Sequence, residues 1–308
     1  MALSVSVPLV IYMAIGALMR ELHILTREQF SALNNLIFRL FLPVLLFTNV
    51  YGADLRGIFH PVLFSFVFLS TIGLVCLFFV LSRLIASDVK NRATIAQGCY
   101  RSNYLFFGTL MAQALCGESG MALLMTLSAL VVPLYNIVAV VLFEVTGGGK
   151  PDPVHLVRSI FKNPIVDAGI LAIVLSFTGI TVPQMILSPF KSIGSCTTPL
   201  ALITLGGVLS FQSMKNDVRM IAFTACARLV VIPLAAVLFA VTVLGFRGDE
   251  MVCVLAVFAS PTAVASAAMA KGLGGNENLA AEIVATTSVA CVATIFLFVY
   301  VLSSLGII

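Results

Sequence analysis

The sequence predicts an all-α membrane protein with ten transmembrane helices. Three observations predict it: 60% of the 308 residues are hydrophobic, only 10% are charged, and the apolar residues gather in ten runs. Soluble globular chains carry roughly 25% charged residues, so this chain has too few to cover a water-facing surface. A membrane helix needs about 20 apolar residues, which the ten runs supply with only short loops left over.

The ten expected helices are separated by short breaks that are charged or contain glycine or proline. They cover residues 3–20, 30–51, 59–84, 92–115, 119–144, 164–180, 186–211, 218–245, 250–271 and 278–305. The first run is apolar ahead of its first basic residue, Arg20, whereas a signal peptide has its positive charge first. We therefore expect the first run to stay in the protein as a membrane helix.

The positions of lysine and arginine predict how the chain lies in the membrane. Eleven of them fall in alternate loops: Arg20, Arg27, Arg83, Lys90, Arg92, Lys150, Arg158, Lys162, Lys215, Arg219 and Lys271. The loops of the other side hold three, Arg56, Lys191 and Arg247. Because basic loops stay in the cytoplasm, we expect both termini to lie outside it, in a plasma or inner membrane.

The chain divides into two similar halves. Its longest polar interruption, residues 146–163, is expected to be a cytoplasmic linker between residues 1–145 and residues 164–308. A shift of 156 positions aligns Pro43 with Pro199, and the pattern of apolar runs repeats at the same offset. Five spans is an odd number, so the second half must be inverted relative to the first. Inverted five-helix repeats are typical of secondary transporters.

The fourth and ninth spans hold corresponding positions in the two halves, and both contain a helix break. In the ninth span, Pro261 lacks a backbone N–H and disfavours helix at Ser260. We expect Ser260 to cap a second half-helix whose first residue is Pro261, followed by Thr262. In the fourth span, the polar residues Arg101, Ser102 and Asn103 interrupt an apolar run, and Ser102 or Asn103 can cap the half-helix that follows.

This arrangement favours an anion. Two half-helix N-termini would meet near mid-depth, each presenting free N–H groups and the positive end of a dipole. Arg101 beside them would attract a carboxylate, although it could equally pair with a carbonyl or an acidic side chain. Arg228, about mid-way along the eighth span, allows the same two interpretations, and Asn49 in the second span is either a site residue or an interfacial one.

Several stretches together form a recognisable pattern: Leu42-Pro43-Val44-Leu45-Leu46, Gly98-Cys99-Tyr100-Arg101-Ser102-Asn103-Tyr104, Gly108, Asn163-Pro164, Thr198-Pro199-Leu200-Ala201 with Gly206-Gly207, and Ser260-Pro261-Thr262-Ala263. Through them the chain resembles the auxin efflux carrier family, specifically its short prokaryotic members, over nearly its whole length. The sequence departs from the family at Gly108-Thr109-Leu110, where a proline is often found. The break in the fourth span therefore depends on residues 100–104 and Gly108 alone.

The resemblance implies a fold and a site. The fold is similar to that of bile-acid/sodium symporters, with spans one, two, six and seven as a scaffold. The other six spans form a transport unit in which spans four and nine cross. Family members export or exchange weak organic acids such as auxins, malate or malonate. Their crossing asparagine and proline line the substrate site and correspond here to Asn103 and Pro261.

We expect a secondary active transporter of a small organic anion, working by alternating access in efflux or exchange, and not an enzyme. The alternatives are an organic-anion channel or uniporter, or a membrane-embedded sensor. The expected substrate-binding residues are Arg101, Ser102, Asn103, Gly108, Ser260, Pro261, Thr262, Asn49 and Arg228.

No cofactor or metal site is expected, because the seven cysteines lie singly in apolar runs and no His or Cys cluster has ligand spacing. The coupling ion, proton or sodium, stays open. The expected partners are the lipid bilayer and the anion, not nucleic acid, and a homodimer is one arrangement that the sequence allows.

Overall fold

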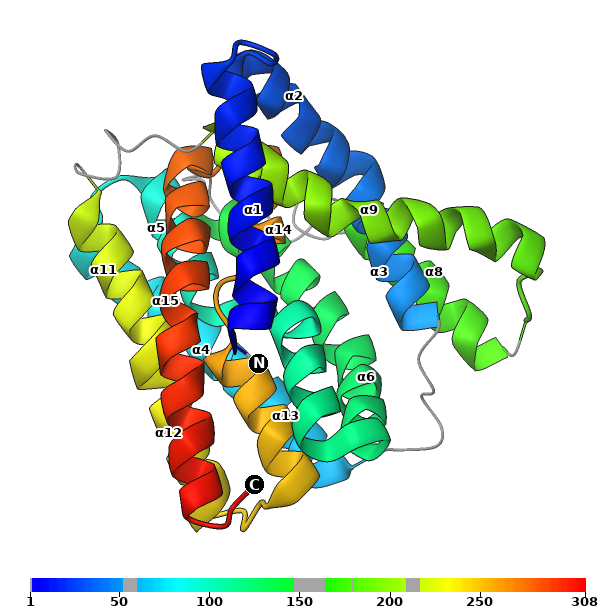
Figure 1. Ribbon diagram of the computed structural model, residues 1–308, viewed down its shortest axis with the longest axis vertical. Helices are drawn as coiled ribbons and strands as arrows, with labels where there is room; N and C mark the ends of the chain where they lie inside the picture. Colours follow the sequence, from blue (N-terminus) through cyan, green and yellow to red (C-terminus); the bar gives the residue numbers. More distant parts are fainter. Residues whose placement is uncertain (1, 52–59, 147–163, 179, 209–216) are drawn as a thin grey trace.

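A computed structural model describes residues 2–51, 60–146, 164–178, 180–208 and 217–308 (Figure 1). Within these ranges the regular structure is helical, and the only extended pairing is an isolated antiparallel bridge between Ser102 and Thr262. The predicted all-α class is therefore consistent with the structure. Of the expected linker 146–163, all but Thr146 lies outside the described residues.

The first half of the chain begins with one unbroken helix and continues with a bulged one. Its helices are α1 (Ala2–Glu21), α2 (Arg27–Leu36), η1 (Ile37–Phe41), α3 (Leu42–Tyr51), α4 (Pro61–Ile85), α5 (Val89–Tyr100) and α6 (Tyr104–Thr146). The π-helical turn η1 joins α2 to α3 without a gap. Within α6, Gly117 has φ 63° and ψ −140°, a conformation that favours glycine, and it divides the element into two helices.

The second half has a similar plan. Its helices are α8 (Pro164–Thr178), α9 (Gln184–Val208), α11 (Val218–Cys226), η2 (Ala227–Val231), α12 (Ile232–Thr242), α13 (Gly248–Ala259), α14 (Ala265–Gly272) and α15 (Glu277–Ser304). Among the described residues, five segments are long and apolar enough to cross a membrane: Arg27–Tyr51, Pro61–Ile85, Met111–Thr146, Val218–Thr242 and Glu277–Ser304. Two other expected spans, 92–115 and 250–271, are divided by breaks, so their separate helices are shorter.

Local chemistry fixes where several helices begin. The Thr26 hydroxyl accepts a hydrogen bond from the Gln29 N–H, and the Gln29 side chain accepts one from the Thr26 N–H, which forms a capping box before α2. Asp88 caps α5 and Asn276 caps α15 in the same way, through a side-chain oxygen. Pro61 lies in the first turn of α4, where its missing N–H leaves no helical bond unmade.

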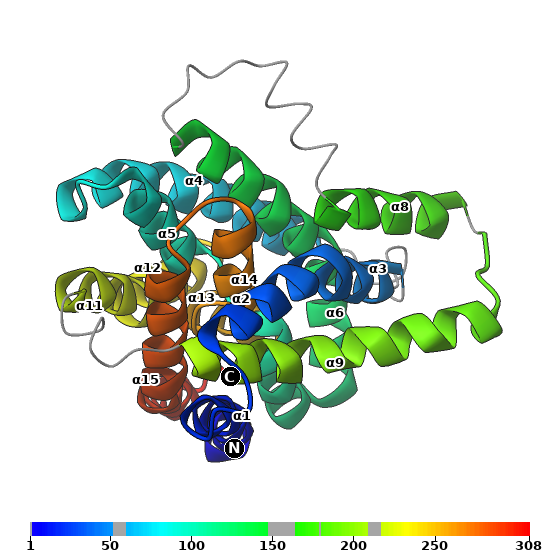
Figure 2. The same ribbon diagram turned by 90° about the horizontal axis from the view of Figure 1, so that it is seen from above.

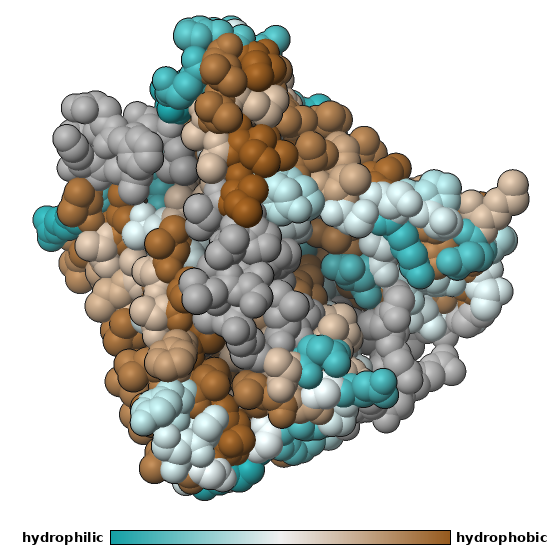
Figure 3. All heavy atoms as spheres, viewed as in Figure 1, coloured by the Kyte–Doolittle hydropathy of each residue, from teal (hydrophilic) through white to brown (hydrophobic). Residues whose placement is uncertain are grey.

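The helices pack as two groups. In one group α1 packs on α9, and α3 packs on α8 and α9; in the other, α4 packs on α5, α13 on α6 and α12, and α14 on α15. In Figures 1 and 2, α8 and one end of α9 project to one side, away from α11 and α12. In Figure 3 hydrophobic residues cover much of the left side of this face, as expected of a protein surrounded by lipid, and hydrophilic residues gather at the upper and lower ends and over the projecting end of α9.

Glycines allow α1 and α9 to cross in backbone contact. A Cβ atom on Gly206 of α9 would overlap the Met13 carbonyl of α1, and one on Gly16 of α1 would overlap the Ile203 carbonyl of α9. Membrane helices associate through such small residues because no hydrophobic force holds them together in lipid. The crossing therefore makes α1 and α9 one unit.

We expect Gly206→Ala to destabilise the protein, because the added methyl group must displace the backbone of α1. Overpacking of this kind costs roughly 1–3 kcal/mol. The matched control is Gly73→Ala in α4, since a Cβ at Gly73 meets no atom within 4 Å. Thermal unfolding of the purified variants in detergent would check this. Equal melting temperatures for the two variants would contradict the backbone contact.

Candidate functional site

Two helix breaks lie at the positions that the sequence predicted. The first separates α5, which ends at Tyr100, from α6, which begins at Tyr104; the second separates α13, which ends at Ala259, from α14, which begins at Ala265. At the first break Arg101 has an extended backbone, with φ −85° and ψ 108°. The interruption is therefore complete, although no proline follows Gly108.

The two breaks cross and satisfy each other's backbone groups. The Asn103 N–H donates to the Pro261 carbonyl at 2.8 Å, and the Ala263 N–H donates to the Arg101 carbonyl at 3.0 Å. The Thr262 hydroxyl donates to the Gly98 carbonyl at 2.8 Å. Irregular backbone can persist at membrane depth only where protein or water supplies such partners. Tertiary pairing thus maintains the first break in place of the missing proline.

The structure corrects the expected role of Ser260. This residue is the C-cap of α13, not the N-cap of the following half-helix, and its hydroxyl donates back to the Ala256 carbonyl at 2.6 Å. The second half-helix begins only at Ala265, so Pro261 is not its first residue. The physical reason is the bridge with the other break, which holds the backbone around Thr262 extended.

Gly108 has a packing role. It is buried in α6 after the first break, and a Cβ atom there would come within 2.7 Å of the Ala256 Cβ in α13. The missing side chain therefore lets α6 lie against α13 beside the crossing.

Arg228 stabilises the crossing by hydrogen bonds to the backbone of both breaks. Its side chain is fully buried and lies in η2. Its guanidinium donates to the Ser260 and Val257 carbonyls at 2.8 and 2.7 Å, and to the Cys99 and Tyr100 carbonyls at 3.1 and 3.4 Å. These carbonyls lie at the C-terminal ends of α5 and α13, which have no further helical N–H to bind. The single positive charge of Arg228 thus offsets the negative C-terminal ends of both α5 and α13.

A cavity of about 210 Å³ lies on the opposite side of the crossing, where the following half-helices begin. The crossing contributes Arg101, Ser102, Asn103, Tyr104, Leu105, Ala263, Val264 and Ala265. The other lining residues are Leu42, Leu45, Leu46, Asn49, Val132, Tyr135, Asn136, Ile165, Thr197, Thr198 and Ala201. Because the latter come largely from α3, α8 and α9, the cavity lies where the two helix groups meet.

Hydrogen-bond donors without partners line this cavity. Arg101 is only 5% exposed, and its Nη2 donates to the Asn136 Oδ1 at 2.7 Å. Its Nε and Nη1 have no hydrogen-bond partner in the described structure, and neither does the Asn103 Nδ2. None of the described lining residues is Asp or Glu. A buried group of this composition is complementary to an anion.

The structure brings together four of the nine predicted site residues. Asn49, Arg101, Ser102 and Asn103 line the cavity, whereas Gly108, Ser260, Pro261, Thr262 and Arg228 do not. Those five instead shape or support the crossing. Sequence reasoning missed Tyr135, Asn136, Thr197 and Thr198. The polar pair Tyr135-Asn136 inside an apolar run was the signal that could have identified two of them.

Comparison with known proteins identifies the family of this chain. A family model described as membrane transport protein matches residues 2–299. The chain belongs to this membrane transport protein family. It is the family of the auxin efflux carriers, so the resemblance inferred from the sequence is confirmed.

Two archaeal relatives are themselves uncharacterised transporters. The one from Methanothermobacter thermautotrophicus is 24% identical over 260 residues, which cover 83% of each chain. The one from Methanocaldococcus jannaschii is 25% identical over 239 residues, covering 73% of this chain and 75% of the relative. Transport across a membrane is therefore the general function of this family member.

Replacement by methionine should destabilise this membrane transport protein to different degrees at its two buried arginines. Arg228→Met leaves four buried carbonyls without their donor, and we expect it to destabilise the protein by about 3 kcal/mol or more. Arg101→Met removes two unpartnered donors and only one hydrogen bond, to the buried Asn136 Oδ1, so we expect a smaller loss of stability than for Arg228→Met. Thermal unfolding in detergent would compare them, and equal destabilisation by both would contradict the distinction.

Proposed function

We propose that this chain is a secondary active transporter of a small organic anion, and that Arg101 and Asn103 bind the anion's carboxylate. One observation carries the proposal: the cavity holds buried nitrogen donors without partners and no acidic side chain among its described lining. An unpaired buried donor is costly, and a carboxylate would satisfy several at once. A cationic substrate would find no counter-charge there.

The helix termini add to the same field. The N-terminal ends of α6 and α14 line the cavity, and each contributes roughly half a positive charge. The negative C-terminal ends of α5 and α13 point the other way, toward Arg228. The crossing thus separates charge, with its positive side facing the cavity.

The size of the cavity favours a small substrate. Pockets for drug-sized ligands are about 300–1,000 Å³, whereas this one is about 210 Å³. A carboxylic acid of a few carbon atoms, malonate-like or malate-like, suits the space better than a large amphipathic anion. The apolar lining from Leu42, Leu45 and Val132 would contact its carbon chain.

Alternating access is supported by the position of the cavity between the two helix groups. Movement of the crossing against α3, α8 and α9 would change which side of the membrane the cavity faces. A channel would need a continuous polar path instead, and the polar residues gather at the crossing.

The helix bounds support two inverted five-helix repeats and ten spans. The segments 27–51 and 61–85 recur at 184–208 and 218–242, an offset of 157 at every end. α5 recurs as α13 at an offset of 159, at 89–100 and 248–259. Together with the excess of basic residues in alternate loops, these repeats favour a protein of the cell membrane with both termini outside the cytoplasm.

The test is uptake of labelled malonate, malate and indole-3-acetate into proteoliposomes under imposed proton and sodium gradients. We expect Arg101→Gln and Asn103→Ala to raise the half-saturating substrate concentration about tenfold or more, because each removes a hydrogen bond to a charged group. Arg83→Gln is the matched arginine control, since Arg83 stacks on Phe79 away from the cavity.

Unchanged transport by the Arg101 and Asn103 variants would refute the proposed site. Uptake that is independent of both ion gradients and depends only on the membrane potential would contradict ion-coupled transport and indicate a uniporter.

A further inference from the structure

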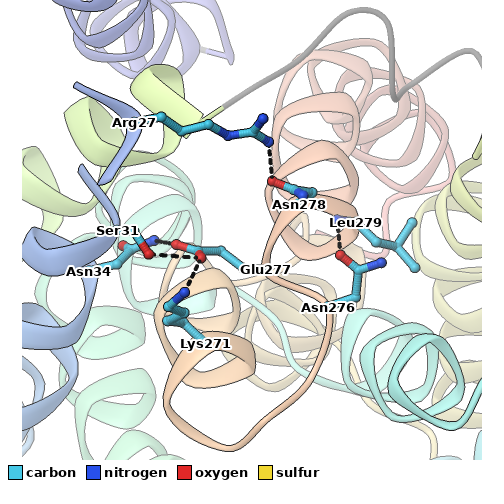
Figure 4. A network of polar contacts seen from close by, with 8 residues as sticks. All are labelled: Arg27, Ser31, Asn34, Lys271, Asn276, Glu277, Asn278 and Leu279. Atoms are coloured by element: carbon cyan, nitrogen blue, oxygen red, sulfur yellow. Dashed lines mark hydrogen bonds and ion pairs between the residues drawn. The ribbon is translucent and has the colours of Figure 1, made fainter. Parts of the chain in front are cut away.

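A polar network joins the two helix groups at one end of the molecule (Figure 4). The Glu277 carboxylate, in the first turn of α15, accepts hydrogen bonds from Asn34 Nδ2 at 2.7 Å and Ser31 Oγ at 3.3 Å, both in α2. Farther out, Arg27 Nη2 donates to Asn278 Oδ1 at 2.8 Å. This end carries the basic residues that are expected to be cytoplasmic, and we call it the basic end.

The network joins two segments that each begin at a wall of the cavity. Leu42 at the start of α3 and Ala265 at the start of α14 both line the cavity. From these residues, η1 with α2 and α14 with α15 run together toward the basic end. The next contact is between Phe38 and Gly272, where a Cβ on the glycine would lie 2.7 Å from the Phe38 ring.

Beyond that contact come Asn34 with Glu277, and then Arg27 with Asn278. The two walls therefore stay in contact from the cavity to the basic end. In this conformation the route between α2 and α14 is closed.

We propose that the contact of Glu277 with Asn34 and Ser31 is the gate of the basic end, and that it must open before the cavity can face that side. This inference rests on the proposed alternating-access function. It concerns the contact of α2 with residues 271–277, where α14 is joined to α15 and which we call the α14–α15 corner. It does not concern the binding of the anion.

The chemistry of the network suits a contact that opens and closes. Glu277 also pairs with Lys271 of α14 at 3.1 Å, and both residues belong to the same corner. When α2 separates, the carboxylate keeps this cation, and water can replace the Asn34 amide and the Ser31 hydroxyl. By contrast, Asn34 is only 1% exposed in the closed state, so its amide depends on Glu277 there.

The experiment measures access to the cavity and needs no substrate. In the full chain, the four cysteines that are not buried (Cys76, Cys116, Cys196 and Cys226) are replaced by serine, and Thr198→Cys places a reporter in the cavity. A membrane-impermeant maleimide is applied to each face of membrane vesicles in turn. We expect Glu277→Ala to raise reporter labelling from the basic end about tenfold, and Asn34→Ala to act in the same direction.

The matched control is Asn91→Ala. Asn91 of α5 accepts a hydrogen bond from Asn276 at 2.7 Å, within the same helix group, and its loss leaves the Asn276 cap of α15 in place, so labelling should stay unchanged. No increase in labelling with Glu277→Ala and Asn34→Ala, for variants that purify as folded protein, would overturn the proposal.

A disulfide tests the opposite direction. Oxidation of the pair Asn34→Cys/Glu277→Cys should abolish both reporter labelling from the basic end and transport, and a reductant should restore them. The pair Asn91→Cys/Asn276→Cys, cross-linked within one helix group, should leave both intact. Unchanged labelling after the first cross-link would overturn the gate, whereas a working gate in a protein that transports no organic anion would refute the proposed function instead.

Discussion

The structure depends on one constraint, that backbone N–H and C=O groups at membrane depth must find partners inside the protein. Two helices of this chain stop short of a full span, so their ends would otherwise be unsatisfied. The crossing solves this with an antiparallel bridge between Ser102 and Thr262 and with the Arg228 guanidinium behind it. The positions of α5, α6, α13 and α14 all follow from this arrangement.

The same solution produces an electrostatic asymmetry. Carbonyls at the C-terminal ends of α5 and α13 converge on Arg228, whose donors they occupy. The N-terminal ends of the following half-helices face the cavity, where Arg101 keeps two donors without partners. The two arginines are both buried, yet Arg228 has its donors satisfied by backbone carbonyls and Arg101 keeps two that are not. This difference is what makes the cavity suited to an anion.

The contacts between helices differ in kind according to what they join. α1 and α9 meet through Gly16 and Gly206 in backbone contact, which allows no relative movement without loss of packing. The α2 and α14–α15 segments meet largely through side chains such as Asn34 and Glu277, which water can solvate when they separate. A transporter that alternates between two faces needs both kinds of contact: permanent ones within each unit and reversible ones between units.

The sequence by itself determined the membrane class, the approximate helix positions and the places where two helices break. Apolar runs, Pro261 and the polar stretch Arg101–Asn103 are local features, and local chemistry is sufficient to interpret them. Only the tertiary structure decided that Ser260 ends a helix instead of starting one, that Arg228 faces backbone carbonyls, and that Asn136 joins Arg101 in the cavity. The residues that Arg228 contacts lie 29 to 129 positions away in the chain, and Thr262 contacts Gly98 across 164 positions within the crossing. Which of two buried arginines keeps free donors depends on where such distant segments meet, and no local pattern in the sequence contains that information.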